Sequence, residues 1–285
     1  MTAAPQRTYG DDELSDFAVE ERTYEGATRR VYRKGTGPAV IVIAEIPGIT
    51  PRVADFARKV ADRGATAVLP SLFGVDGRDP HPRTVGNVRS GKIMLDTIVR
   101  ACISREFTVL ATGRSSPVTT WLRALATEEH ERCGGPGVGA VGMCFTGGFA
   151  LAMAADDRLL APVLSQPSLP FAALPGRRHA IDIDADDLAT VQNRCAAGLQ
   201  VLGLRFDGDP LSPPGRFEFL SQQLGDAFIG VSLPDSAAHP ESMHPKPHSV
   251  LTEDLIDEPG QPTHDALTQV LEFFATKLEI PAPPR

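Results

Sequence analysis

The chain has 285 residues, and its hydrophobic share of 42 % and charged share of 22 % are ordinary for a soluble globular protein. Its net charge of −8 and its lack of a basic block argue against nucleic acid or an anionic membrane as a partner. No sequence window approaches the ~18 uninterrupted apolar residues of a membrane span, and the polar first residues lack the apolar core of a signal peptide, so we expect a cytoplasmic protein.

The first part of the chain predicts a hairpin followed by alternating strands and helices. Residues 22–35 have the pattern of a hairpin, with Glu25-Gly26 in its turn. The apolar runs 38–46 and 66–73 are typical of parallel strands that are buried on both faces. Between them, residues 50–64 carry the apolar spacing of a helix that ends at a glycine.

The rest of the chain continues this alternation after a polar loop at 74–90. Apolar runs predict strands at 138–143, 161–167, 200–206 and 227–234. Helices are predicted at 91–103, 117–130, 147–155, 185–196 and 213–224 and after Pro262. Because strands and helices alternate nearly throughout, we predict an α/β fold with a mostly parallel central sheet and helices on both faces.

The domain organisation follows from the same pattern. Residues 21–280 are predicted to form one α/β domain, with tails at 1–20 and 281–285. The span 169–185 has the composition of an insertion or lid rather than of a second domain.

Four cysteines are present, and one of them stands in an unusual place. Cys102, Cys133 and Cys195 have no CxxC spacing, so they predict neither a disulfide framework nor a cysteine-based metal site. Cys144 instead follows a buried strand directly and precedes a helix of small residues.

The sequence around Cys144, GMCFTGG, is typical of a nucleophile at a sharp strand–turn–helix corner. Such a corner needs small neighbours, and Gly142, Gly147 and Gly148 supply them. The helix N-terminus that follows favours the thiolate, which is the reactive form of cysteine. The elbow usually reads G-x-nucleophile-x-G, whereas here Thr146 holds the fifth position. A cysteine that only fills a tight packing point is the alternative.

In enzymes with this elbow, an acid and then a histidine follow the nucleophile along the chain. The loop after strand 200–206 offers Asp207 and Asp209, and Asp209 is the better candidate because it starts the turn D-P-L-S-P. The loop after the last strand contains three histidines, of which we choose the most distal. The three are His239, His244 and His248. Three histidines also leave a metal-dependent hydrolase open, although no HExxH or cysteine companion supports a metal site.

At this point the chain resembles a known family. The segments AVIVIAEIPGITPRVADFARKVADRGATAVLPSLFG, GAVGMCFTGG, FDGDPLSP and PHS are similar to those of the dienelactone hydrolases, which are α/β-hydrolases with a Cys–Asp–His triad. The resemblance extends over about residues 20–280 and is best at 38–74 and 139–149. The pattern G-x-C-x-x-G-G is fairly specific, since most α/β-hydrolases carry serine at the elbow.

By position, the resemblance implies that Cys144 is the nucleophile, Asp209 the orienting acid and His248 the base. Glu45 matches a family glutamate that lies beside the cysteine and helps to control its ionisation. Glu45 has independent support, because it ends an apolar strand where a charge is unexpected without a role.

The resemblance also implies how a substrate would be held. The backbone N–H groups of Ile46 and Phe145 would form the oxyanion hole. The family holds the substrate carboxylate with two arginines. Arg105 is the closest match to one of them, but the other position, four residues after the histidine, is Thr252.

These features together predict an enzyme that hydrolyses a small ester or lactone through a thioester intermediate. It needs no metal and no organic cofactor, and its partner is a small-molecule substrate. The sequence does not predict an oligomeric state. The alternative is a non-catalytic or thiol-sensing binding protein on the same fold.

Overall fold

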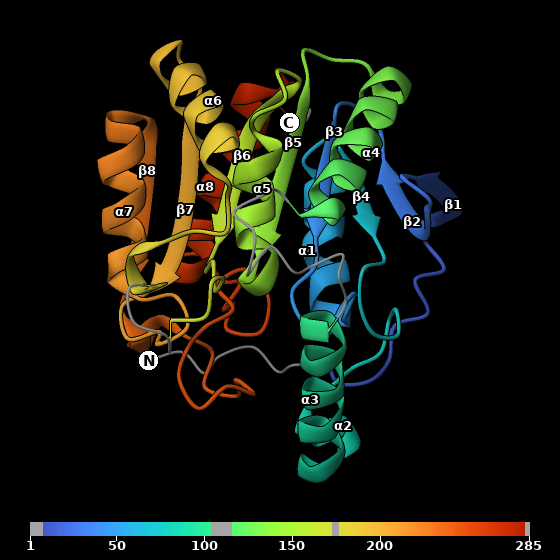
Figure 1. Ribbon diagram of the computed structural model, residues 1–285. Helices are drawn as coiled ribbons and strands as arrows, with labels where there is room; N and C mark the ends of the chain where they lie inside the picture. The colour runs from blue at the N-terminus through green and yellow to red at the C-terminus, as the bar shows by residue number, and fades with distance from the viewer. Residues whose placement is uncertain (1–7, 104–115, 173–176, 283–285) are drawn as a thin grey trace.

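A computed structural model of the chain describes residues 8–103, 116–172 and 177–282. Over these residues the chain forms one eight-stranded sheet with helices on both faces (Figure 1). The strand order is β1-β2-β4-β3-β5-β6-β7-β8, and β3 to β8 are parallel while β1 and β2 pair in antiparallel fashion. The predicted α/β fold with a mostly parallel sheet is therefore confirmed.

The strands in chain order are β1 Ala18–Tyr24, β2 Ala27–Gly35, β3 Ala39–Ile43, β4 Thr66–Pro70, β5 Val138–Met143, β6 Leu159–Ser165, β7 Val201–Phe206 and β8 Phe228–Leu233. The helices are α1 Pro51–Asp62, α2 Pro82–Val85, α3 Asn87–Ile103, α4 Pro117–Cys133, α5 Gly147–Met153, α6 Ala185–Ala196, α7 Pro214–Leu224 and α8 Pro262–Lys277. None of these helices is long and apolar enough to cross a membrane.

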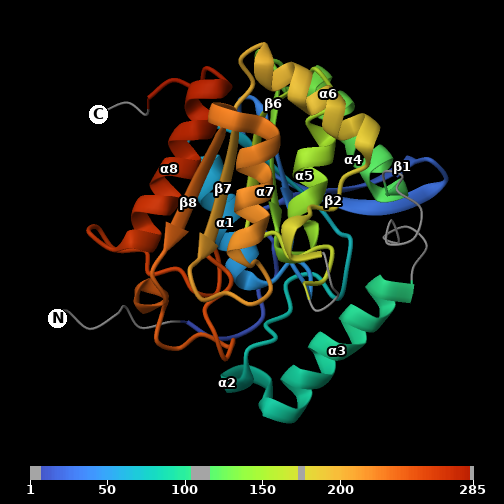
Figure 2. The ribbon, with the colours of Figure 1, turned by 60° about the vertical axis from the view of Figure 1, so that its left-hand side comes forward.

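The sheet separates two hydrophobic cores because side chains alternate along each strand. In β3, Val40 and Val42 pack into the core beneath α1 and α8. Ile41 and Ile43 pack into the opposite core beneath α4, α5 and α7. Figure 2 shows α8 on one side of the sheet and α5 and α7 on the other. Burial on both faces explains why β3 is continuously apolar.

The predicted elements differ from the observed ones mainly at their ends. The hairpin is confirmed, with Glu25 and Gly26 both at positive φ (52° and 76°), but β1 already begins at Ala18. The apolar run 38–46 contains a shorter strand, Ala39–Ile43, and Thr50 caps α1 by accepting a hydrogen bond from the Val53 N–H. The predicted polar loop at 74–90 is partly wrong, because it contains α2 and the first turn of α3.

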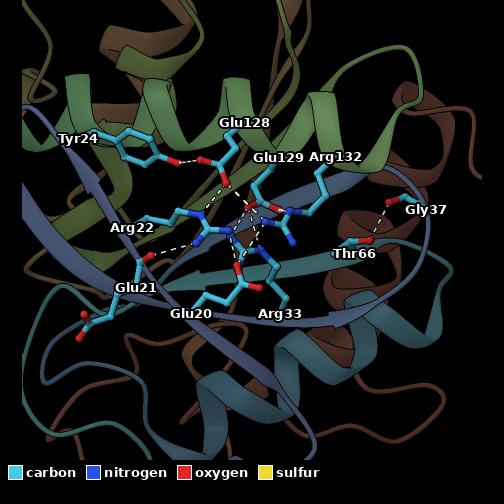
Figure 3. Close-up of polar contacts among 10 residues, drawn as sticks. All are labelled: Glu20, Glu21, Arg22, Tyr24, Arg33, Gly37, Thr66, Glu128, Glu129 and Arg132. Atoms are coloured by element: carbon cyan, nitrogen blue, oxygen red, sulfur yellow. Dashed lines mark hydrogen bonds and ion pairs between the residues drawn. The ribbon is translucent and has the colours of Figure 1, made fainter.

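The β1–β2 hairpin is fastened to α4 by charged side chains (Figure 3). Arg33 donates to the buried Glu129 through Nε at 2.8 Å, and Arg22 donates to Glu128 at 2.6 Å. Tyr24 also donates to Glu128. We call this set the hairpin network; its members are Glu20, Arg22, Tyr24, Arg33, Glu128, Glu129 and Arg132.

Candidate active site

Cys144 occupies a strained corner between β5 and α5. Its φ is +53°, a left-handed conformation that is unusual for a residue other than glycine and that is found where a nucleophile is held out of a sharp turn. A Cβ on Gly142 would lie 2.2 Å from the Thr146 carbonyl oxygen, and one on Gly147 would lie 2.6 Å from Pro167. Both glycines are therefore required by close backbone approach.

Thr146 explains why the elbow departs from the usual glycine pattern. Its side chain is fully buried, and its hydroxyl lies 2.9 Å from both the Met143 nitrogen and the Ile43 carbonyl oxygen. The hydroxyl thus accepts from β5 and donates to β3, which ties the corner to the neighbouring strand. The close approach that a fifth-position glycine would permit is supplied one residue later, by Gly147.

A buried histidine–carboxylate pair lies at the same end of the sheet. Asp209 follows β7 and His248 follows β8, and His248 Nδ1 lies 2.7 Å from Asp209 Oδ2. Asp209 also accepts a hydrogen bond from the Leu211 N–H at 2.9 Å. The alternative acid Asp207 has a side chain that is 61 % exposed, so of the two predicted acids only Asp209 is buried against the histidine.

The other ring nitrogen of His248 faces the thiol. His248 Nε2 is buried without a hydrogen-bond partner among the described residues, and its ring, Cys144 Sγ and a Glu45 oxygen lie within 4.8 Å of one another. Burial by itself favours the neutral ring, but the Cys144 sulfur and the Asp209 carboxylate outweigh it and raise the pKa of His248 well above its ordinary value. An imidazolium in this place stabilises a thiolate.

Asp254 holds the backbone on which His248 is presented. Its Oδ2 accepts hydrogen bonds from the N–H groups of His248 and Ser249, each at 2.8 Å, and the side chain is fully buried. Asp254 thus holds the backbone at His248 and Ser249, while Asp209 orients the His248 ring.

Glu45 is buried beside the thiol and is held by neutral donors. Ser249 Oγ donates to Glu45 Oε2 at 2.7 Å, and Gln166 Nε2 donates to the same oxygen at 3.2 Å. Thr252 donates to the other oxygen. Thr252, at the position where the resemblance predicted an arginine, therefore helps to hold the Glu45 carboxylate in place.

Ser168 is a further residue in contact with Cys144. Its Oγ lies 3.2 Å from Cys144 Sγ, and its N–H donates to the Cys144 carbonyl at 2.9 Å. The fully buried Arg216 in turn donates to the Ser168 carbonyl at 3.0 Å and to the carbonyls of the next two residues. Burial lowers the pKa of Arg216 to about 10, against the carboxylates that favour its charge.

The two predicted oxyanion donors come shortly after the ends of neighbouring strands. Ile43 pairs with Gly142 in the parallel ladder between β3 and β5. Ile46 comes three residues after the end of β3, and Phe145 comes two residues after the end of β5, directly after Cys144. Arg105, the predicted substrate-binding residue, lies outside the described residues.

Among the described residues, Glu45, Cys144 and His248 form the one cluster of three side chains that is close enough to hold a metal ion. The loop histidines His239, His244 and His248 do not form such a cluster. The alternative of a three-histidine metal site therefore finds no support, and Cys144 is the centre of the candidate site.

An elbow after β5, an acid after β7 and a histidine after β8 of this sheet define an α/β-hydrolase fold. A model of the dienelactone hydrolase family matches residues 27–172, and the chain belongs to this family.

Solved structures agree with the fold. A dienelactone hydrolase-like promiscuous phosphotriesterase from metagenomic libraries aligns with a TM-score of 0.58 and 17 % identity, over 92 % of this chain and 98 % of that one. A dienelactone hydrolase from Anabaena variabilis aligns with a TM-score of 0.56 and 14 % identity, again over 92 % and 98 % of the two chains. No curated protein matches the sequence significantly.

Sequence reasoning missed several residues of the site. Gln166 directly follows β6, and Glu45 lies two residues after β3, so a polar residue after an apolar run was an available signal. Ser249 directly follows the chosen histidine. Asp254 and Arg216 act through backbone contacts, and Ser168 contacts both the backbone and the thiol of Cys144. No spacing in the sequence distinguishes these three residues.

Proposed function

We propose that the protein hydrolyses a small ester or lactone in the cytoplasm, with Cys144 as the nucleophile and without a metal or an organic cofactor. Membership of the dienelactone hydrolase family supports a hydrolase. The observation that carries the finer proposal is the buried His248, which contacts Asp209 through Nδ1 at 2.7 Å and turns its other nitrogen toward the thiol. This is the order of contacts that a nucleophile, a base and an orienting acid require.

Acylation begins with the thiol proton on His248, so that the thiolate faces an imidazolium. The sulfur attacks the substrate carbonyl, and the N–H groups of Ile46 and Phe145 stabilise the oxyanion. The loss of one such donor typically costs about 3–4 kcal/mol of transition-state stabilisation. His248 then gives its proton to the leaving alkoxide, and a thioester on Cys144 remains.

Deacylation uses the same groups in reverse. His248 takes a proton from water, the resulting hydroxide attacks the thioester, and the thiolate leaves. Asp209 keeps Nδ1 protonated throughout, so that Nε2 serves as the base. The carboxylic acid product is released and the imidazolium–thiolate pair is restored.

The contacts of Thr252 narrow the substrate class. Its hydroxyl donates to Glu45, and a neutral side chain at this position cannot pair with a substrate carboxylate as an arginine would. We therefore expect neutral esters and lactones to be hydrolysed more efficiently than a dienelactone that carries a carboxylate.

The test is hydrolysis of an activated short-chain aryl ester, a simple aliphatic lactone and a cis-dienelactone by the wild type and by Cys144→Ala. We expect turnover that depends on Cys144 and a kcat/KM that is highest for a neutral substrate. Equal activity of the two proteins would contradict the proposal. It would favour the thiol-sensing binding protein, which should still show selective alkylation of Cys144 over Cys133 and Cys195.

A further inference from the structure

A chain of hydrogen bonds leads from the surface to the buried Glu45. His244 Nε2 lies 3.3 Å from Ser249 Oγ, and Ser249 Oγ donates to Glu45 Oε2 at 2.7 Å. Ser249 is fully buried and Glu45 is 5 % exposed, whereas the His244 residue is only partly buried. The ring of a partly buried histidine is thus connected to a carboxylate beside Cys144 through one hydroxyl.

The chemistry of the three groups suits the transfer of a proton. A serine hydroxyl accepts one hydrogen bond while it donates another, and an imidazole can take up a proton on one nitrogen and release one from the other. His244 Nδ1 makes no hydrogen bond within the described part of the chain, so it is the nitrogen available to water. The His244 and His248 rings lie edge to face, with centroids 5.5 Å apart, and only His248 bonds to Asp209.

We infer that His244 and Ser249 form a proton relay that connects Glu45 with solvent, separately from the His248–Asp209 pair. This inference rests on the proposed role of Cys144. When deacylation frees the thiolate, a hydronium ion gives a proton to His244 Nδ1, and the Nε2 proton passes to Ser249 Oγ. Ser249 gives its own proton to Glu45 Oε2. The neutral Glu45 no longer repels the thiolate, and the relay runs backward when the thioester removes that charge.

Charges around His244 are consistent with a relay that is neutral at rest. Burial and the neighbouring His248 lower the pKa of His244, against the carboxylates of Glu45, Asp254 and Asp209, which favour the protonated ring. A ring with a lowered pKa releases a proton to its neighbours or to water readily, so it does not trap the proton that it carries.

The experiment compares three variants by ester hydrolysis across pH. His244→Gln keeps a side chain that can bond to Ser249 but cannot pass a proton, and we expect kcat to fall about tenfold with little change in KM. Added imidazole should restore kcat in a concentration-dependent manner. Ser249→Ala should lose a similar factor without rescue, because the His244 ring still occupies its place. The matched control, His264→Gln, removes a surface histidine that bonds to Asp257 and should leave kcat and its pH profile unchanged.

Labelling of Cys144 with iodoacetamide, followed by mass spectrometry across pH, separates the two proposals. The proposed function requires Cys144 to react faster than Cys133 and Cys195. The relay requires, in addition, that His244→Gln and Ser249→Ala each shift the pH midpoint of this reaction. A reactive, catalytically essential Cys144 with unshifted midpoints and unchanged kcat in both variants would overturn the relay alone. Ser249→Thr, which retains the hydroxyl, should restore the wild-type profile, and failure to do so would also count against the relay.

Discussion

Two clusters of charged side chains in this molecule are built differently. In the hairpin network, each carboxylate faces a guanidinium (Figure 3). Burial opposes the ionisation of Glu128, but hydrogen bonds from Tyr24 and Arg22 outweigh it and lower the pKa of this carboxyl. These ion pairs fasten β1 and β2 to α4.

Among the described residues, the cluster around Cys144 contains an ion pair between His248 and Asp209 at 2.7 Å, but its other carboxylates do not face a guanidinium. Glu45 is held by two hydroxyls and an amide, and Asp254 by backbone N–H groups. Arg216 donates its hydrogen bonds to backbone carbonyls rather than to a carboxylate. Neutral donors hold an acid in place without fixing its charge, which is what groups that exchange protons during a reaction require. The hairpin network holds structural elements together, whereas the cluster around Cys144 has the groups that the proposed reaction requires.

The largest effect on activity is expected from Asp209→Asn, in the cluster around Cys144. The amide can still accept the Leu211 N–H, but it no longer stabilises an imidazolium or fixes the tautomer of His248. We expect kcat for an activated ester to fall about 10⁴-fold, as when the orienting acid of a catalytic triad is removed. A variant that keeps more than a tenth of the activity would show that Asp209 does not orient the base.

In the hairpin network, Arg33→Ala is expected to have a large effect on stability rather than on activity. This change leaves Glu129 buried without its principal partner and should lower the free energy of unfolding by about 3–5 kcal/mol. The specific activity of the folded protein should be retained. Urea unfolding measures the loss, and the double variant Arg33→Met/Glu129→Met should recover much of it. Equal losses in the single and double variants would contradict the unpaired-charge explanation.

Asp182, near the elbow, provides a prediction about how the free energy of unfolding depends on pH. It lies against Gly148 near the elbow, and burial raises its pKa from 3.8 to about 6 in spite of Arg216 and Arg177. Between these values the folded protein binds more protons than the unfolded chain, so the free energy of unfolding falls as pH rises and the full cost is present above pH 6.

Asp182→Asn should therefore stabilise the protein at pH 8 by up to about 3 kcal/mol and have little effect at pH 4. Urea unfolding at both pH values measures this difference. Asp226→Asn, at an exposed position, is the control and should show no such pH dependence. A gain that is the same at both pH values would rule out the titration of Asp182 as its cause.

The smallest effect is expected at the rim of the hairpin network. Arg132 is 40 % exposed and contacts Glu20 at 3.3 Å, and Glu20 is 43 % exposed. Such pairs contribute about 0–1 kcal/mol and weaken with salt. Arg132→Ala should thus lower the free energy of unfolding by less than about 1 kcal/mol in 0.15 M salt. A loss above 2 kcal/mol would mean that the network acts as one cooperative unit, and double-mutant cycles with Glu20→Ala would then measure the coupling.

The sequence predicts the sheet well because its central strands are continuous apolar runs, which are typical of strands buried on both faces. The run AVIVI reads as a strand packed on both faces, and it is one. The helix predicted at about 185–196 agrees with α6, and in the structure Asp184 caps its start by accepting a hydrogen bond from the Asp187 N–H. The elbow could be located as well, since close backbone approach at Gly142 and Gly147 restricts which residues fit. The single domain and the lid at 169–185 remain predictions.

The support around the thiol was not predictable in the same way. Arg216 lies on α7 yet holds carbonyls after β6, a contact between residues about fifty positions apart that leaves no periodic trace. Thr252 was noticed only as a missing arginine, because its bond to Glu45 depends on how the loop after β8 folds back over β3. Long-range polar contacts of this kind are set by tertiary packing rather than by local pattern.

The position of β1 gives the hairpin network a second consequence. β1 ends the sheet, and the backbone groups along the outer side of such a strand are a template onto which another chain can add. Three consecutive residues of β1, Glu20, Glu21 and Arg22, are charged, and a foreign strand that paired there would have to bring matching charges or leave these unsolvated. The side chains that fasten the hairpin to α4 thereby also protect the protein against aggregation through its edge.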